Sequence, residues 1–170
     1  MNEQNEQTAL LLPPSIVTKV DVSRLVSEME QVDNELITRD AHIKANVPIT
    51  SQISLSQQLS DFLSVNTLEI GDGAMRSDLI KRLRHIKNTA PMVHITFASS
   101  ADTESLRELV VWLRQSVHPQ SVITVGLQPS LIGGAYIRTP NRVHDFSLRA
   151  RLAGHRDIIT KEVEALSGVK

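Results

Sequence analysis

The segment Val122–Leu152, VITVGLQPSLIGGAYIRTPNRVHDFSLRARL, decides the fold of this 170-residue chain. Its first residues are rich in the branched apolar types that favour strands, and Gln128–Ser130 interrupts them. Ala135–Arg138 resumes the strand pattern before a turn at Thr139–Asn141. Ser147 then begins a helical pattern. We therefore predict a strand, a turn, a second strand and a final helix, in this order.

A strand and a helix are predicted just upstream of this segment. Val93, Ile95 and Phe97 alternate with polar residues, which is the two-residue period of a half-buried strand. A capping segment at Ser99–Asp102 leads into a helical stripe formed by Leu106, Leu109, Val110, Leu113 and Val117. Residues 91–170 thus have the order β-α-β-β-α of a small α/β domain whose helices cover a sheet. Its last helix is predicted over residues 147–166, with five apolar side chains turned inward: Leu148, Leu152, Ile159, Val163 and Leu166.

Residues 21–90 have the pattern of three amphipathic helices. Asp21 is the expected N-cap of the first, over Val22–Thr38, and Ser51 or Ser54 that of the second. The turn signal Gly71–Gly73 introduces the third. Residues 1–20 are predicted to be a flexible tail. The fold class is therefore α+β, with an N-terminal three-helix unit over residues 21–90 followed by the α/β domain over residues 91–170.

The composition excludes several classes of protein. A formal net charge of −1 argues against a general nucleic-acid binder, and the absence of cysteine excludes disulfides and thiolate metal sites. Three Phe, one Tyr and one Trp supply few platforms for base stacking. The apolar run Ala9–Leu12 is too short for a signal peptide or a membrane span. We therefore expect a soluble protein that partners can hold at a membrane.

The glycines and polar residues of the deciding segment are best explained structurally. A phosphate-binding P-loop needs a glycine-rich turn followed by Gly-Lys-Ser/Thr at a helix start, whereas a strand follows Gly133–Gly134. A bulge or a close backbone approach explains the two glycines better. Asp145 and Ser147 suit the cap of the last helix. His144 does not complete a catalytic relay with them, because neighbours on a strand point to opposite faces.

The other charged residues favour surface roles. Six histidines, at positions 42, 85, 94, 118, 144 and 155, show no metal-ligand spacing. The basic run Lys81–Lys87 invites a nucleic-acid interpretation, but apolar residues interrupt it at core spacing, so we prefer a solvated helix face. Arg149 and Arg151 do not share a helix face, and either of them can pair inside the domain. The sequence thus predicts no catalytic residue, no metal and no cofactor.

One motif in the segment resembles a known family. Pro-Ser-Leu-Ile-Gly-Gly, a strand and then Asp-x-Ser-x-Arg-x-Arg-Leu are similar to the C-terminal signature of the delta subunit of F-type ATP synthases, the oligomycin-sensitivity-conferring protein family. The matching positions are Leu131, Ile132, Gly133, Gly134, Asp145, Ser147, Leu148, Arg149, Arg151 and Leu152. Phe146 and Ala150 stand where small glycines are common in the family. The resemblance covers the chain from Pro91 onward.

The resemblance implies a non-catalytic joint in the peripheral stalk of a proton-translocating ATP synthase. Such a subunit links the N-terminal segments of the alpha subunits to the C-terminal ends of the b subunits at the cytoplasmic face of the membrane, with no nucleic-acid contact, no membrane insertion and no cofactor. Helix pattern and resemblance together nominate Val22, Leu25, Met29, Leu79 and Leu83 for the alpha interface, and Ile159, Val163 and Leu166 for the b interface. The alternative is a non-catalytic adaptor that reuses this C-terminal domain outside ATP synthase.

The N-terminal part departs from the family, whose N-terminal domain is a six-helix bundle. Three helices alone would leave apolar faces uncovered. Residues 1–20 could add an irregular cover, an alpha-subunit helix could complete the core, or the domain could have diverged to bind something else. The second explanation is the one we favour from sequence.

Overall fold

A computed structural model describes residues 10–48, 52–139 and 141–167, apart from the side chains of Ile159 and Ser167. The fold is α+β, as predicted. The chain divides into two compact units. The helical unit comprises Met1–Pro91 together with Glu104–Val122, and the sheet unit comprises Met92–Thr103 together with Ile123–Lys170.

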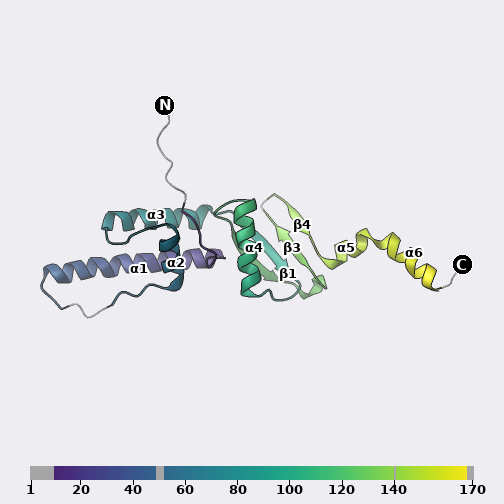
Figure 1. The fold of residues 1–170 in the computed structure, drawn as a ribbon, viewed down its shortest axis with the longest axis horizontal. Helices are drawn as coiled ribbons and strands as arrows, with labels where there is room; N and C mark the ends of the chain where they lie inside the picture. The colour runs from purple at the N-terminus through teal and green to yellow at the C-terminus, as the bar shows by residue number, and fades with distance from the viewer. Residues whose placement is uncertain (1–9, 49–51, 140, 168–170) are drawn as a thin grey trace, which may run out of the picture. The chain divides into compact units, whose positions relative to one another are not determined.

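The helical unit contains α1 (Lys19–Lys44), α2 (Gln57–Val65), α3 (Gly73–Thr89) and most of α4 (Thr103–Ser116). α1 and α3 run alongside each other (Figure 1) and share the larger part of the core. Their buried apolar residues recur at helical spacing: Val22, Leu25, Val26, Met29 and Val32 on α1, and Leu79, Ile80, Leu83 and Ile86 on α3. α2 adds Leu59, Phe62 and Leu63, and α4 adds Val110 and Leu113.

The helix starts correct the sequence-based boundaries. Thr18, and not Asp21, is the N-cap of α1, and the two residues form a capping box: the Asp21 amide donates to the Thr18 hydroxyl (3.2 Å) and the Thr18 amide to the Asp21 carboxylate (2.8 Å). α1 also runs well past Thr38. Ser56 caps α2 in place of Ser54, while Ser51 lies outside the described residues.

The segment before α1 corrects the prediction of a flexible tail over residues 1–20 for its described part, residues 10–20, while residues 1–9 lie outside the described residues. Residues 10–17, which we call the strap, bury Leu10, Leu12, Ile16 and Val17. Arg114 on α4 fixes the strap: its guanidinium donates to the carbonyls of Leu12 (3.0 Å), Pro13 (2.9 Å) and Ile16. It also donates to the carbonyl of Ser121 (3.1 Å). Burial lowers the pKa of Arg114 to about 10.

The strap and α4 therefore supply the cover that three helices lack. The first of the three explanations describes the chain itself, because the apolar faces that we expected an alpha-subunit helix to complete are filled by residues of this chain. α4, expected to belong with the sheet, groups with the helical unit. Its predicted stripe is buried at Val110 and Leu113 but exposed at Val117.

The sheet has the strand order β2-β1-β3-β4. Its strands are β1 (Met92–Phe97), β2 (Val122–Leu127), β3 (Ala135–Arg138) and β4 (Val143–Asp145). β3 is antiparallel to β1, with His94 opposite Arg138, and β4 is antiparallel to β3. The Gln128 amide donates to the carbonyl of Phe97, and the Val122 amide to that of Pro91, so β2 runs parallel to β1. β4 was not predicted, since its three exposed residues carry no apolar alternation.

The C-terminal helix also differs from the prediction. It is divided at His155 into α5 (Leu148–Gly154) and α6 (Arg156–Ser167). The side chains expected to face inward are exposed: Leu148 by 44%, Leu152 by 50%, Val163 by 58% and Leu166 by 87%. The side chain of Ile159 lies outside the described ones. α5 and α6 thus present apolar side chains that no described part of the chain covers.

Candidate functional site

Gly133 and Gly134, which precede β3, pack against the backbone that leads into α5. Gly134 has a φ of 86°, and a Cβ there would lie 2.3 Å from the carbonyl oxygen of Phe146. Only glycine fits this close approach without moving backbone. Two backbone hydrogen bonds, both 2.9 Å long, hold the two segments together: the Phe146 amide donates to the Ala135 carbonyl and the Leu148 amide to the Gly133 carbonyl. Gly133 is less constrained, because its Cβ would meet the Leu148 side chain at 3.6 Å.

Asp145 and Ser147 form the cap of α5, as the sequence predicts. The Ser147 hydroxyl accepts from the Ala150 amide (3.2 Å), and the Asp145 carboxylate accepts from the Ser147 amide (2.8 Å). Hydrogen bonds from the Ser147 hydroxyl and from the Ser147 amide hold the pKa of Asp145 below its ordinary value. A hydrogen bond with Asp145 raises the pKa of Tyr136. Arg149 lies close enough for its charge to act on both groups.

His144 does not take part in this cap. It pairs with Ile137 on β3, whereas Asp145 pairs with Tyr136, so the two neighbours point to opposite faces of the sheet. The His144 ring instead stacks on Phe146 with centroids 6.0 Å apart. The Asp145, His144 and Ser147 side chains are therefore not aligned as a proton relay.

The residues nominated for the alpha interface lie in the core of the helical unit. All are at most 5% exposed: Val22, Leu25, Met29, Leu79 and Leu83. A contact with a partner through these side chains would require α1 and α3 to separate. The sequence pattern marked them as apolar and periodic, which is what a core residue requires.

The helical unit does carry an open groove that sequence reasoning missed. It has a volume of about 620 Å³ and lies between the strap, α2 and α4. Its carboxylates are Asp61, Glu104 and Glu108, and its one cation, Arg107, pairs with Glu104 at 3.4 Å. Val65 and Val111 add apolar surface. We call it the acidic groove; no signal in the sequence brings residues so far apart together.

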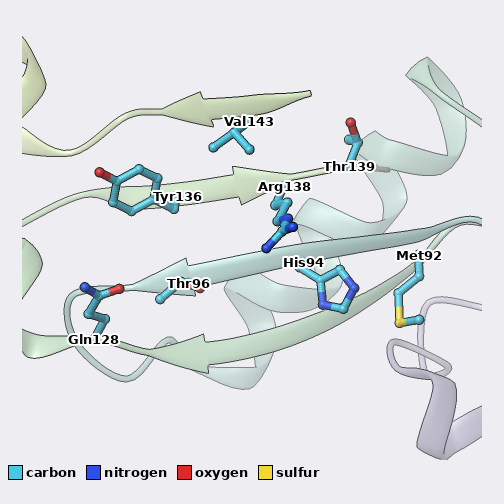
Figure 2. A pocket seen from close by; sticks show the side chains of 8 residues that line it. All are labelled: Met92, His94, Thr96, Gln128, Tyr136, Arg138, Thr139 and Val143. Carbon is cyan, nitrogen blue, oxygen red and sulfur yellow. The ribbon is translucent and has the colours of Figure 1, made fainter. Parts of the chain in front are cut away.

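A second hollow, of about 810 Å³, lies on one face of the sheet (Figure 2). We call it the polar sheet face. It is lined by Met92, His94, Thr96, Gln128, Tyr136, Arg138, Thr139 and Val143. The strand alternation already predicted that His94 and Thr96 share a face, but the register that adds Tyr136 and Arg138 follows only from the structure.

The described residues contain neither a metal-binding cluster nor a membrane-spanning helix. No three His, Cys, Asp or Glu side chains in the described ranges lie in an arrangement that could hold a metal ion. None of the described helices is long and apolar enough to cross a membrane.

The fold and these surfaces define a two-unit α+β protein with exposed apolar side chains on its C-terminal helices and an open hollow in each unit. A sequence model of the ATP synthase delta (OSCP) subunit family matches residues 33–158. The chain therefore belongs to this family, which forms a structural rather than a catalytic part of ATP synthase.

Three curated relatives agree with this assignment, and each is described as ATP synthase subunit delta. The protein of Cupriavidus taiwanensis is 30% identical over 155 residues, or 81% of this chain and 82% of the relative. Those of Cupriavidus pinatubonensis and Cupriavidus metallidurans are each 29% identical over 81% of this chain and 83% of the relative.

Proposed function

We propose that this protein is the peripheral-stalk subunit that links the alpha/beta head of a proton-translocating F-type ATP synthase to its b-subunit stalk. It acts as a non-catalytic joint at the cytoplasmic face of the membrane. Family membership supports a structural role in ATP synthase. The observation that carries the linking role is the uncovered apolar surface of α5 and α6.

The stalk contact is proposed on α5 and α6. Leu152, Ile158, Val163 and Leu166 are each at least half exposed, and a run of exposed apolar residues on a monomer marks an interaction site. Ile159 belongs to the same proposed interface by its helical spacing. The C-terminal end of a b subunit, supplied as an amphipathic helix, would cover this stripe by helix-to-helix packing.

The head contact is proposed in the acidic groove. An alpha N-terminal segment that folds as a helix with an apolar stripe and flanking Lys or Arg would complement Val65 and Val111 and the three carboxylates. The two contacts use different units, so the subunit can hold both partners at once. A nanomolar contact corresponds to about 12 kcal/mol, which standard interfaces of about 1,600 Å² reach when well packed.

The test is purification of the tagged full-length protein from its native membranes. We expect alpha, beta and b subunits to copurify. Val163→Glu combined with Leu166→Glu should lose the b subunit while retaining alpha. Lys161→Glu, which adds the same kind of charge at an exposed polar position of α6, should retain both.

Reversing the charge of the acidic groove gives the complementary result. Glu104→Lys combined with Glu108→Lys should lose alpha and retain b, because the groove would then repel a basic helix. Recovery of neither subunit with folded wild-type protein would reject the stalk function. That outcome would favour a non-catalytic adaptor outside ATP synthase.

A further inference from the structure

The polar sheet face presents two cross-strand rows of side chains. The pairing places His94, Arg138 and Val143 in one row and Thr96, Tyr136 and Asp145 in the next. Figure 2 shows the Arg138 side chain lying between β3 and β1, on the side of His94. Gln128, at the end of β2, extends the face on the far side of β1.

The cation and the carboxylate of the polar sheet face differ in their partners. Arg138 is exposed, and the ion pairs found among the described residues do not include it. Its row offers no acid, since its neighbours across the strands are His94 and Val143. The carboxylate of the next row, Asp145, accepts from Ser147 and Tyr136. A cation with hydrogen-bond donors around it is thus left at the centre of the hollow.

We propose that the polar sheet face binds an acidic peptide segment of a partner chain, with one carboxylate held by Arg138. The planar guanidinium suits a carboxylate, and the Thr96 and Thr139 hydroxyls supply further hydrogen-bonding groups on the same face. Val143 on β4 and Met92 at the start of β1 give apolar surface on two different sides of Arg138 for the neighbours of that carboxylate.

A nucleic acid or polyphosphate suits the face less well. The lining contains one permanent cation and, besides the His94 imidazole, only the ring of Tyr136, whereas phosphate binding relies on several Lys or Arg and base binding on stacked aromatics. The Asp145 carboxylate beside Tyr136 also repels a second negative group there. The inference uses residues outside α5, α6 and the acidic groove, and it does not depend on the proposed function.

The test selects ligands without assuming a partner. A library of random 12-residue peptides displayed on phage is selected on the full-length protein, and the affinity of the best peptides is measured by fluorescence anisotropy. We expect selected peptides to share a Glu or Asp flanked by apolar residues. Replacing that acid by Gln or Asn, or making Arg138→Gln, should weaken binding about tenfold, the usual scale for losing a charge-assisted hydrogen bond.

Matched controls separate this site from general charge attraction. Arg39→Gln removes the same charge from an exposed position of α1 and should leave the affinity unchanged. Circular dichroism checks that Arg138→Gln keeps the wild-type fold. Peptides that lack an acid, or that bind Arg138→Gln as tightly as the wild type, would overturn the proposal. Displacement of the peptide by millimolar inorganic phosphate, or tighter binding of a single-stranded oligonucleotide, would overturn it too.

Discussion

α1 and α6 are both amphipathic helices, yet their apolar residues have opposite surroundings. Val22, Leu25 and Met29 on α1 are at most 1% exposed, whereas Val163 and Leu166 on α6 are 58% and 87% exposed. The first helix packs against α3 and α2 within its own chain. The comparison teaches that an amphipathic pattern predicts that a helix face will be covered, but not which molecule covers it.

The largest expected effect comes from truncating matched leucines in the two regions. Leu83→Ala empties a fully buried position on α3 and should lower the free energy of unfolding by about 2–5 kcal/mol. Leu166→Ala should change it by less than about 0.5 kcal/mol, because the side chain is already in water. Denaturant titration of both variants measures the difference. Equal losses would mean that α6 is covered in the free protein.

The next largest effect on stability is expected at Gly133 and Gly134, which contact the segment that leads into α5. Gly134→Ala should destabilise the protein by about 2–4 kcal/mol, because a side chain there adopts a positive φ and collides with backbone. Gly133→Ala is the matched control and should cost about 1 kcal/mol or less, since its Cβ makes ordinary contacts. Thermal unfolding followed by circular dichroism compares them. If the two variants unfold alike, the close approach to Phe146 is not maintained in solution.

Arg114 tests how firmly the strap is held. Arg114→Met keeps much of the buried stem but leaves the carbonyls of Leu12, Pro13 and Ile16 without their donor, so stability should fall by about 1–3 kcal/mol. Amide hydrogen exchange in residues 10–17 should accelerate at the same time. Arg107→Met, at an exposed position on the same helix, should leave exchange there unchanged.

The smallest effect concerns the cap of α5. Since the folded-state pKa of Asp145 is lowered, its contribution to stability is present above the unfolded value of 3.8 and is lost as the pH falls through the folded pKa. Asp145→Asn should therefore flatten the acid limb of the stability curve slightly. An NMR titration of the Asp145 carboxyl carbon should give a midpoint below 3.8. A midpoint at or above that value would contradict the cap geometry.

Much of the fold could be predicted because it rests on local patterns. The alternation at Met92–Phe97 and the apolar spacing along α1 and α3 are direct consequences of strand and helix geometry. The strap could not be predicted. Leu10 and Leu12 are buried, but they precede two prolines and follow neither a helical nor a strand period. The carbonyl of Leu12 is held by a guanidinium that lies 102 residues later in the chain.

The candidate site divides in the same way. The role of Ser147 depends on the Ala150 amide three residues later, so cap chemistry predicts it. The Gly-Gly pattern predicts the close backbone approach at Gly134 but not its partner, Phe146, which lies farther along the chain. The residues nominated for the alpha interface rest instead on apolar periodicity. Such periodicity predicts that a helix face is buried, but it does not predict whether the same chain or a partner buries it. The proposed role of Arg138 could not be predicted from sequence, because it depends on the register of β3 against β1.

The bond between Arg114 and the strap has a consequence for synthesis on the ribosome. The N-terminal half of the helical unit leaves the ribosome first, yet the guanidinium that fixes the strap lies 102 residues after Leu12. At a translation rate of about 5–20 residues per second, that interval lasts on the order of 5–20 s. Throughout it, the apolar side chains of the strap lack the α4 residues against which the finished unit holds them, so the core of this unit closes only after Arg114 has been synthesised.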